Sequence, residues 1–355
     1  MNALTPKGRY VVLAAVFLGW MFAGMEMALM VPTARPAIQD FLATGKLASL
    51  AAADKPAVVE TLADKWFSWF LVAFLLGAAC GGIVFGWLGD RAGRRRAMGW
   101  SILCYSTVTG LSYFVETPGQ LLVLRFVTCL GIGGMWPCGV ALAAEAWPRA
   151  TRAALAGLIG AAANVGFLVL GLIMLRHPVT HDSWRWVLLL GGSPFLLGVF
   201  VLLWIPESPS WLEERNAKEA SKPAPIREVF RPPLRRFTLL GIALGTIPLL
   251  GGWASGERLV PWAGQIGEQQ GLPQLKALVQ TFWAVGAVVG SLLGGWLASR
   301  LGRRRSYFLI SLGSLALSAY IFLVLRPTSP EFLWTTFALG LVSTSFFGWL
   351  PYFLP

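Results

Sequence analysis

Ten stretches of the chain are apolar over about twenty residues each, which is the length that crosses the hydrocarbon core of a bilayer as a helix. They cover 10–31, 66–88, 97–115, 119–144, 153–175, 184–205, 237–256, 275–298, 306–325 and 332–350. Only 13% of the residues are charged, whereas a soluble domain carries about 25%. Because so little polar side chain is available to cover a surface, the sequence predicts an all-α membrane protein with lipid as part of its solvent.

The distribution of basic residues predicts the orientation of these spans. With the N-terminus in the cytoplasm, nineteen of the 29 Lys and Arg residues fall on the cytoplasmic side. They lie in 1–9, 91–96, 149–152, 215–236 and 300–305. Since cytoplasmic loops carry an excess of Lys and Arg, we predict a multi-pass integral protein of the bacterial inner membrane with a cytoplasmic N-terminus. The net charge of +12 then marks the inner membrane face, which argues against a nucleic-acid partner.

A long polar segment divides the predicted spans into two groups. Residues 207–236 are basic and punctuated by prolines, which is typical of a linker. Six predicted spans precede this segment and four follow it. We therefore predict an N-terminal six-helix bundle at 1–206, a cytoplasmic linker at 207–236, and an incomplete C-terminal bundle of four helices at 237–355.

One short segment occurs twice at equivalent places in the two groups. The stretch "GWLGDRAGRRR" begins at Gly86 and "GWLASRLGRRR" begins at Gly295, with eight of eleven positions identical. A parallel repeat of this kind is typical of alternating-access transporters. Gly86 and Gly93 are predicted to permit a tight turn and close helix contact, and Asp90 to accept backbone N–H groups or face a helix N-terminus. The residues assigned to these two gating loops are Gly86, Asp90, Arg91, Gly93, Arg94, Arg95, Gly295, Arg300, Gly302, Arg303 and Arg304.

The first copy resembles the signature loop of the major facilitator superfamily, Gly-x-Leu-x-Asp-Arg-x-Gly-Arg-Arg. Three further stretches resemble the same family: "GWMFAGMEMALMVPTARPAI" at 19–38, "RFVTCLGIGGMWP…AAEAWPRATR" at 125–152, and "WRWVLLLGGSPFLLGVFVLLWIPESPSWL" at 184–212. They are similar to the metabolite:proton symporter branch and to the sugar, organic-ion and aromatic-acid branches. The resemblance implies the major facilitator fold, with two pseudo-symmetric helical bundles and ten of the usual twelve transmembrane helices present. It also implies cytoplasmic exit elements at Glu145, Arg149, Arg152 and Glu207.

The sequence departs from the family pattern in several places. It stops after the tenth span, which we interpret as a truncated reading frame. Ser299 replaces the loop aspartate in the second copy, and Ala23 stands where the symporter branches often carry aspartate. In the family, the loop carboxylate binds the N-terminus of the eleventh helix, so Asp90 is expected to lack a partner within this chain.

Glu26 and Arg125 are ionisable residues inside predicted spans. Inserting such a group costs about 2.5–3.5 kcal/mol on translocon scales, so a partner or a function is expected. The resemblance implies that their helices lie side by side at the central compartment. We hypothesise that the two side chains pair, and that protonation of Glu26 releases Arg125 to bind an anionic substrate. The alternative is snorkelling, because both side chains lie within reach of the outer interface.

Four more residues are candidates for substrate or proton binding. Asn164 is the lone amide of its span, and either binds substrate or hydrogen-bonds a neighbouring helix. Glu257 lies in a weak echo of the first span and is a candidate counterpart of Glu26. Trp283 and Trp349 either line the compartment or pack within the protein, as aromatic residues in spans commonly do.

The sequence contains none of the common catalytic or nucleotide-binding motifs, including GxxxxGK[ST], HExxH and Gly-x-Ser-x-Gly. We therefore predict no enzyme activity, no cofactor and no metal. The predicted function is secondary active transport of a small organic solute (a carboxylate, sugar or related metabolite) by alternating access, as a proton-coupled symporter. Its expected partners are that solute, protons and the lipid bilayer, and the protein is expected to be a monomer. The alternative is a non-transporting membrane remnant that acts as a sensor or binds a partner.

Overall fold

The computed structural model describes residues 5–44, 56–147, 152–217, 228, 230–248 and 254–349. All regular secondary structure in this part of the chain is helical, which confirms the predicted all-α class. In chain order the helices are α1 (Pro6–Ala43), α2 (Pro56–Ala92), α3 (Arg94–Leu111), η1 (Ser112–Phe114), α4 (Pro118–Ala146), α5 (Arg152–Arg176), α6 (Trp186–Gly192), α7 (Phe195–Trp204), α8 (Pro209–Ala217), α9 (Leu234–Pro248), α10 (Ala254–Gln269), α11 (Leu275–Leu301), α12 (Arg303–Leu323), α13 (Phe332–Thr344) and η6 (Ser345–Gly348).

Seven segments of the described helices are long and apolar enough to cross a membrane, so the chain is a multi-pass membrane protein. They match seven of the ten predicted spans. The other three predicted spans are covered by shorter or more polar helices. The helix α3 begins with three arginines, and α13 with η6 forms one shorter apolar segment. The seventh predicted span is divided between α9 and α10, with 249–253 outside the described residues.

Several helices extend further than their apolar stretches predicted. The helices α1 and α2 contain 38 and 37 residues, and a helix of that length spans roughly 55 Å, well beyond the hydrocarbon core. Residues 32–43 and 56–65, which lie between the first two predicted spans, are therefore helical, and Arg35 and Glu60 form an ion pair between them. Hydropathy ends a predicted span where polar residues begin, but the backbone hydrogen bonds of a helix continue past that point.

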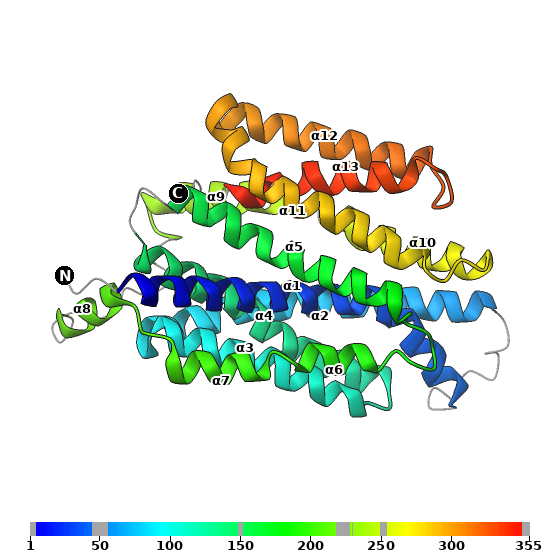
Figure 1. Ribbon diagram of the computed structural model, residues 1–355, viewed down its shortest axis with the longest axis horizontal. Helices are drawn as coiled ribbons and strands as arrows, with labels where there is room; N and C mark the ends of the chain where they lie inside the picture. The colour runs from blue at the N-terminus through cyan, green and yellow to red at the C-terminus, as the bar shows by residue number, and fades with distance from the viewer. Residues whose placement is uncertain are drawn as a thin grey trace. The chain divides into compact units, whose positions relative to one another are not determined.

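The chain divides into two compact units: 1–147 with 165–209, and 148–164 with 210–355. In the first unit, α4 packs against α1, α2 and α3, while α6 and α7 pack against α3 (Figure 1). In the second, α11 packs against α10 and α13, and α12 packs against α13 (Figure 1). The predicted linker includes the helix α8. The predicted bundle at 1–206 also differs from the first unit, because residues 148–164 are grouped with the second.

The repeated loop has the same backbone conformation in both units. Gly93 precedes α3 with φ 106° and ψ 150°, and Gly302 precedes α12 with φ 80° and ψ 151°. In each copy the carbonyl of that glycine accepts the N–H of the residue four positions later, at 3.1 and 3.0 Å. Glycine is favoured there because side chains rarely tolerate positive φ. The predicted turn is thus confirmed for Gly93, but it is wrong for Gly86, which lies inside α2 with open space beside it.

Candidate functional site

Glu26 lies in the middle of α1 and is fully buried. Its Oε2 accepts a hydrogen bond of 2.9 Å from the Thr109 hydroxyl of α3. The hydroxyls of Thr109 and Thr128 are 3.3 Å apart, so Thr128 of α4 continues this short chain of polar groups. Among the described residues, the second carboxyl oxygen, Oε1, has no hydrogen-bond partner. A buried polar atom without a partner is costly, so a functional explanation is needed for Oε1.

Arg125 reaches the same place from α4 and is only 6% exposed. Its Nη1 donates to the main-chain oxygen of Glu26 at 3.0 Å, and its Nη2 to that of Met27 at 3.5 Å. The guanidinium carbon lies 5.9 Å from the centre of the Phe74 ring. The structure therefore brings Glu26 and Arg125 together, as the sequence predicts, but the guanidinium binds the backbone beside the carboxyl. Both side chains are buried, whereas snorkelling requires a charged group that reaches water.

This arrangement gives the first unit a buried acid and a buried guanidinium on adjacent helices. A carboxyl can gain or lose a proton, and a guanidinium presents several donors to a carboxylate or phosphate. The Tyr105 hydroxyl donates to the Gly19 carbonyl of α1 at 3.2 Å, which further joins α3 to α1. The first unit thus holds a titratable acid and the donors of a guanidinium within one small region.

Asn164 makes a hydrogen bond between helices within the second unit. Its amide donates to the Ser291 hydroxyl at 2.9 Å and to the Ala287 carbonyl at 3.5 Å, both on α11. The Thr344 hydroxyl also donates to that carbonyl, at 2.8 Å. Of the two alternatives for Asn164, substrate binding or a hydrogen bond to a neighbouring helix, the geometry fits the hydrogen bond.

The other candidates of the second unit are buried on α10, α11 and beyond η6. Glu257 lies in the first turn of α10. The ring of Trp283 packs so closely against α10 that a Cβ on Gly256 would lie 3.0 Å from it. Trp349 packs in a cluster with Ala298, Ile310 and Phe346, so packing is the alternative that fits its surroundings.

Two buried polar residues of α11 are not among the residues predicted from the sequence. Lys276 and Gln280 are 8% and 3% exposed, and Trp283 follows on the same face of the helix. Their spacing of four and three residues places all three side chains in one row. Their helical spacing within an apolar stretch could have indicated a buried polar row. Lys276, however, lies at the start of a predicted span, where a lysine is expected to reach the membrane interface.

The first loop forms a cluster of charges in the first unit. Arg94 Nη1 lies 2.5 Å from Asp90, and its Nε lies 3.5 Å from Glu145 at the end of α4. The expectation that Asp90 lacks a partner within the chain is therefore wrong. One turn of helix separates Asp90 from Arg94, which is close enough for a direct ion pair. Glu145 also accepts a hydrogen bond from the Ser208 hydroxyl.

Glu207 caps the N-terminus of α3 from a distant part of the sequence. Its Oε1 accepts the Arg95 backbone N–H at 2.9 Å. A Cβ on Gly93 would lie 2.1 Å from Glu207 Oε2, so this contact also requires glycine. The guanidinium of Arg95 donates to the Ile205 carbonyl at 3.2 Å. The helix N-terminus thus has its negative partner, but Glu207 supplies it where the sequence suggested Asp90.

The second loop keeps the arginines and loses the carboxylate. Arg91 lies over Trp87 at 4.4 Å and Arg300 over Trp296 at 5.2 Å, at equivalent positions of the two copies. The hydroxyl of Ser299 donates to the backbone of its own helix at 2.7 Å. The remaining predicted residues are placed as follows: Gly295 lies inside α11, Arg303 and Arg304 begin α12 with exposed side chains, Arg152 begins α5 with its side chain outside the description, and Arg149 lies outside the described residues.

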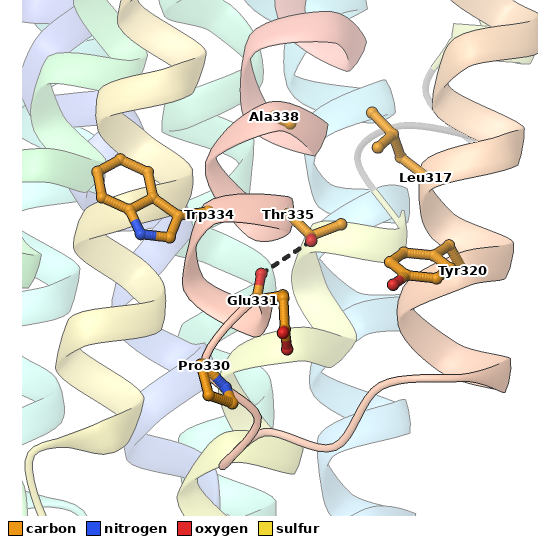
Figure 2. A pocket seen from close by; sticks show the side chains of 7 residues that line it. All are labelled: Leu317, Tyr320, Pro330, Glu331, Trp334, Thr335 and Ala338. Carbon is orange, nitrogen blue, oxygen red and sulfur yellow. Dashed lines mark hydrogen bonds between the residues drawn. The ribbon is translucent and has the colours of Figure 1, made fainter.

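A cavity of about 530 Å³ lies in the second unit between α12 and α13, and none of the predicted site residues lines it (Figure 2). It is lined by Leu317, Tyr320, Pro330, Glu331, Trp334, Thr335 and Ala338. The Thr335 hydroxyl donates to the Glu331 carbonyl at 2.8 Å (Figure 2). Within the described ranges, no three His, Cys, Asp or Glu side chains gather as metal ligands would.

Known proteins resemble the chain over most of its length. The model of the Major Facilitator Superfamily matches residues 16–355. A Haemophilus influenzae protein named for metabolite transport is 32% identical over 254 residues, covering 68% of this chain and 60% of that protein. The cis,cis-muconate transport protein of Acinetobacter baylyi is 28% identical over 264 residues, covering 72% and 62%. The chain thus spans about 60% of the length of these two relatives.

A solved structure shows the same fold. The xylose transporter XylE from E. coli, in a partially occluded inward-open conformation, superposes with a TM-score of 0.68 at 16% sequence identity. The match covers 96% of this chain and 85% of that one.

Proposed function

Because the chain belongs to the major facilitator superfamily, we propose that it forms a secondary active transporter for a small organic solute, working by alternating access. The matching backbone at Gly93 and Gly302 supports this proposal, since parallel repeats are a feature of such carriers. The proposed solute is a carboxylate, sugar or related metabolite, and the proposed location is the bacterial inner membrane, with a cytoplasmic N-terminus and a monomeric carrier.

We further propose that transport is coupled to protons through Glu26 and Arg125. The observation that carries this proposal is the buried Glu26 carboxyl, one oxygen of which has no hydrogen-bond partner in the described part of the chain. Beside it lies a guanidinium that donates to main-chain oxygens. A charged carboxylate attracts the guanidinium, and a neutral carboxyl does so much less. Protonation of Glu26 therefore leaves Arg125 available to a substrate anion, and loss of the proton favours release of that anion.

The test uses the protein reconstituted in proteoliposomes and a panel of radiolabelled probes. The panel contains xylose, arabinose, cis,cis-muconate and benzoate, each measured with an imposed proton gradient and with a protonophore. Glu26→Gln is expected to abolish gradient-driven accumulation of the transported probe while exchange at equal concentrations continues. Glu213→Gln, on the exposed surface of α8, is the matched control.

Two outcomes contradict these proposals. Full dependence of uptake on the gradient in Glu26→Gln would exclude Glu26 as the coupling residue. A probe that binds to the wild-type protein without crossing the membrane would contradict transport and favour a sensor or partner-binding protein.

A further inference from the structure

The Glu26 oxygen Oε1 lies beside Gly191, a residue of the short helix α6. A Cβ built on Gly191 would lie 2.6 Å from Glu26 Oε1, 2.6 Å from Thr109 Cγ2 and 2.7 Å from Leu29 Cδ1. Atoms do not approach a real Cβ this closely, so the three helices meet here only because residue 191 has no side chain. The Glu26 carboxyl lies in the space that a side chain at residue 191 would fill.

The helix α6 is held in place at one end and interrupted at the other. Immediately before it, Trp184 Nε1 and Arg185 Nη1 both donate to Asp40 of α1, at 3.0 and 2.5 Å. Arg185 also donates to the Val115 carbonyl, at 3.2 Å. At the other end Pro194 has no N–H to donate, and α6 stops at Gly192. Because the anchored end limits how far α6 can retreat, a methyl group at Gly191 would displace the carboxyl.

The Thr109 hydroxyl donates a hydrogen bond to the other carboxyl oxygen, Oε2, so the carboxyl group has little freedom to move. The ionisable residues that face Glu26 are Arg125 and Cys129 from α4 and Tyr105 from α3. The helix α6 itself contains no ionisable residue. The contribution of α6 is therefore steric: it sets where the carboxyl lies relative to Arg125 and Thr109.

We propose that Gly191 is a positioning residue for Glu26, and that its missing side chain holds the carboxyl in the place where it exchanges its proton. This inference rests on the proposed role of Glu26 in proton coupling. A displacement of about 1 Å at a reacting group can cost up to a hundredfold in rate. Gly191→Ala is therefore expected to lower gradient-driven uptake of the transported panel probe at least tenfold.

The matched control is Gly192→Ala, one residue further along α6. A Cβ there would lie 3.2 Å from the Gly110 Cα and 3.6 Å from the Ser106 carbonyl, and it does not contact Glu26. The double variant Gly191→Ala with Glu26→Asp tests the steric explanation, because the shorter acid leaves room for the methyl group. We expect the double variant to retain more uptake than Gly191→Ala alone. We expect Gly192→Ala to lose less uptake than Gly191→Ala, because its closest contact, at 3.2 Å, is the Gly110 backbone and not the carboxyl.

A second measurement reports on the carboxyl itself. The infrared band of the protonated Glu26 carboxyl, identified by its absence in Glu26→Gln, is followed against pH in the reconstituted protein. A change in its frequency or its titration in Gly191→Ala, but not in Gly192→Ala, supports the proposal. If Gly191→Ala fails to fold, the same substitution in a Glu26→Ala background is expected to be more stable, since one of the three clashing groups is gone.

Equal effects of the two glycine substitutions, or a double variant whose losses simply add, would overturn the proposal. So would a Gly191→Ala protein whose stability is not raised at all by Glu26→Ala. These results are separate from those for the proposed function. A displaced infrared band in Gly191→Ala, together with unchanged proton dependence in Glu26→Gln, would leave the positioning role intact and remove the coupling role.

Discussion

Single polar side chains at helix ends and helix centres make the hydrogen bonds that join distant parts of this chain. Glu207 is the clearest example outside the buried pair. The N-terminus of α3 has a glycine as its cap, with no side chain to accept the first backbone N–H groups. The carboxylate of Glu207 takes that role from the segment between α7 and α8. An acceptor at a helix N-terminus also gains from the helix dipole.

Glu207→Ala is expected to lower the free energy of unfolding by about 1–2 kcal/mol, the usual loss on removal of a helix cap. Glu207→Gln should lose less, because its amide oxygen still accepts a hydrogen bond. Unfolding in detergent micelles, followed by circular dichroism, measures both. Glu213→Ala on the exposed face of α8 is the control, and an equal loss in that variant would show that Glu207 does not act as a cap.

The helical hairpin α2–α3 and its counterpart α11–α12 form the most clearly repeated element. Both turn at a glycine with positive φ, and both begin the next helix with three arginines. In both, the arginine two residues before that glycine stacks on the tryptophan one helical turn earlier. They differ in what surrounds the turn. Glu207 fills the space beside Gly93, whereas no atom lies within 4 Å of a Cβ built on Gly302.

This difference predicts a graded response to alanine at three glycines. Gly302→Ala should cost about 1–3 kcal/mol from its backbone conformation alone. Gly93→Ala should cost more, because the methyl group also displaces Glu207. Gly86→Ala, inside α2 with open space, should be neutral or stabilising by up to about 1 kcal/mol. Unfolding midpoints of the three proteins in the same detergent give the order, and any other order would contradict the assignment of these contacts.

The arrangement of the complete chain in the membrane is tested by its topology. Two like-oriented repeats require both arginine loops on the same side of the bilayer. In a background that lacks Cys80, Cys104, Cys129 and Cys138, a cysteine at Arg96 and one at Arg305 are expected to react with a membrane-impermeant maleimide only from the cytoplasmic side. Reaction of the two sites from opposite sides would exclude the parallel repeat and, with it, alternating access by two equivalent bundles.

Much of this organisation is encoded locally and is therefore visible in the sequence. Apolar length predicts spans because lipid offers the backbone no hydrogen bonds. The repeated Gly-Arg loop predicts two equivalent turns, because positive φ favours glycine wherever it occurs. The proximity of Glu26 and Arg125 followed from the family resemblance.

The tertiary structure decided which partner each polar group takes. Arg125 binds main-chain oxygens, Asp90 pairs with Arg94, and Glu207 caps a helix more than a hundred residues earlier in the chain. The lengths of α1 and α2 also exceed their apolar stretches. Hydropathy and spacing act along a single helix, whereas hydrogen-bond partners and the space at Gly191 depend on how separate helices approach one another. The sequence by itself determined the apolar core of most helices and the two turns at Gly93 and Gly302, and only packing determined which atoms of separate helices meet.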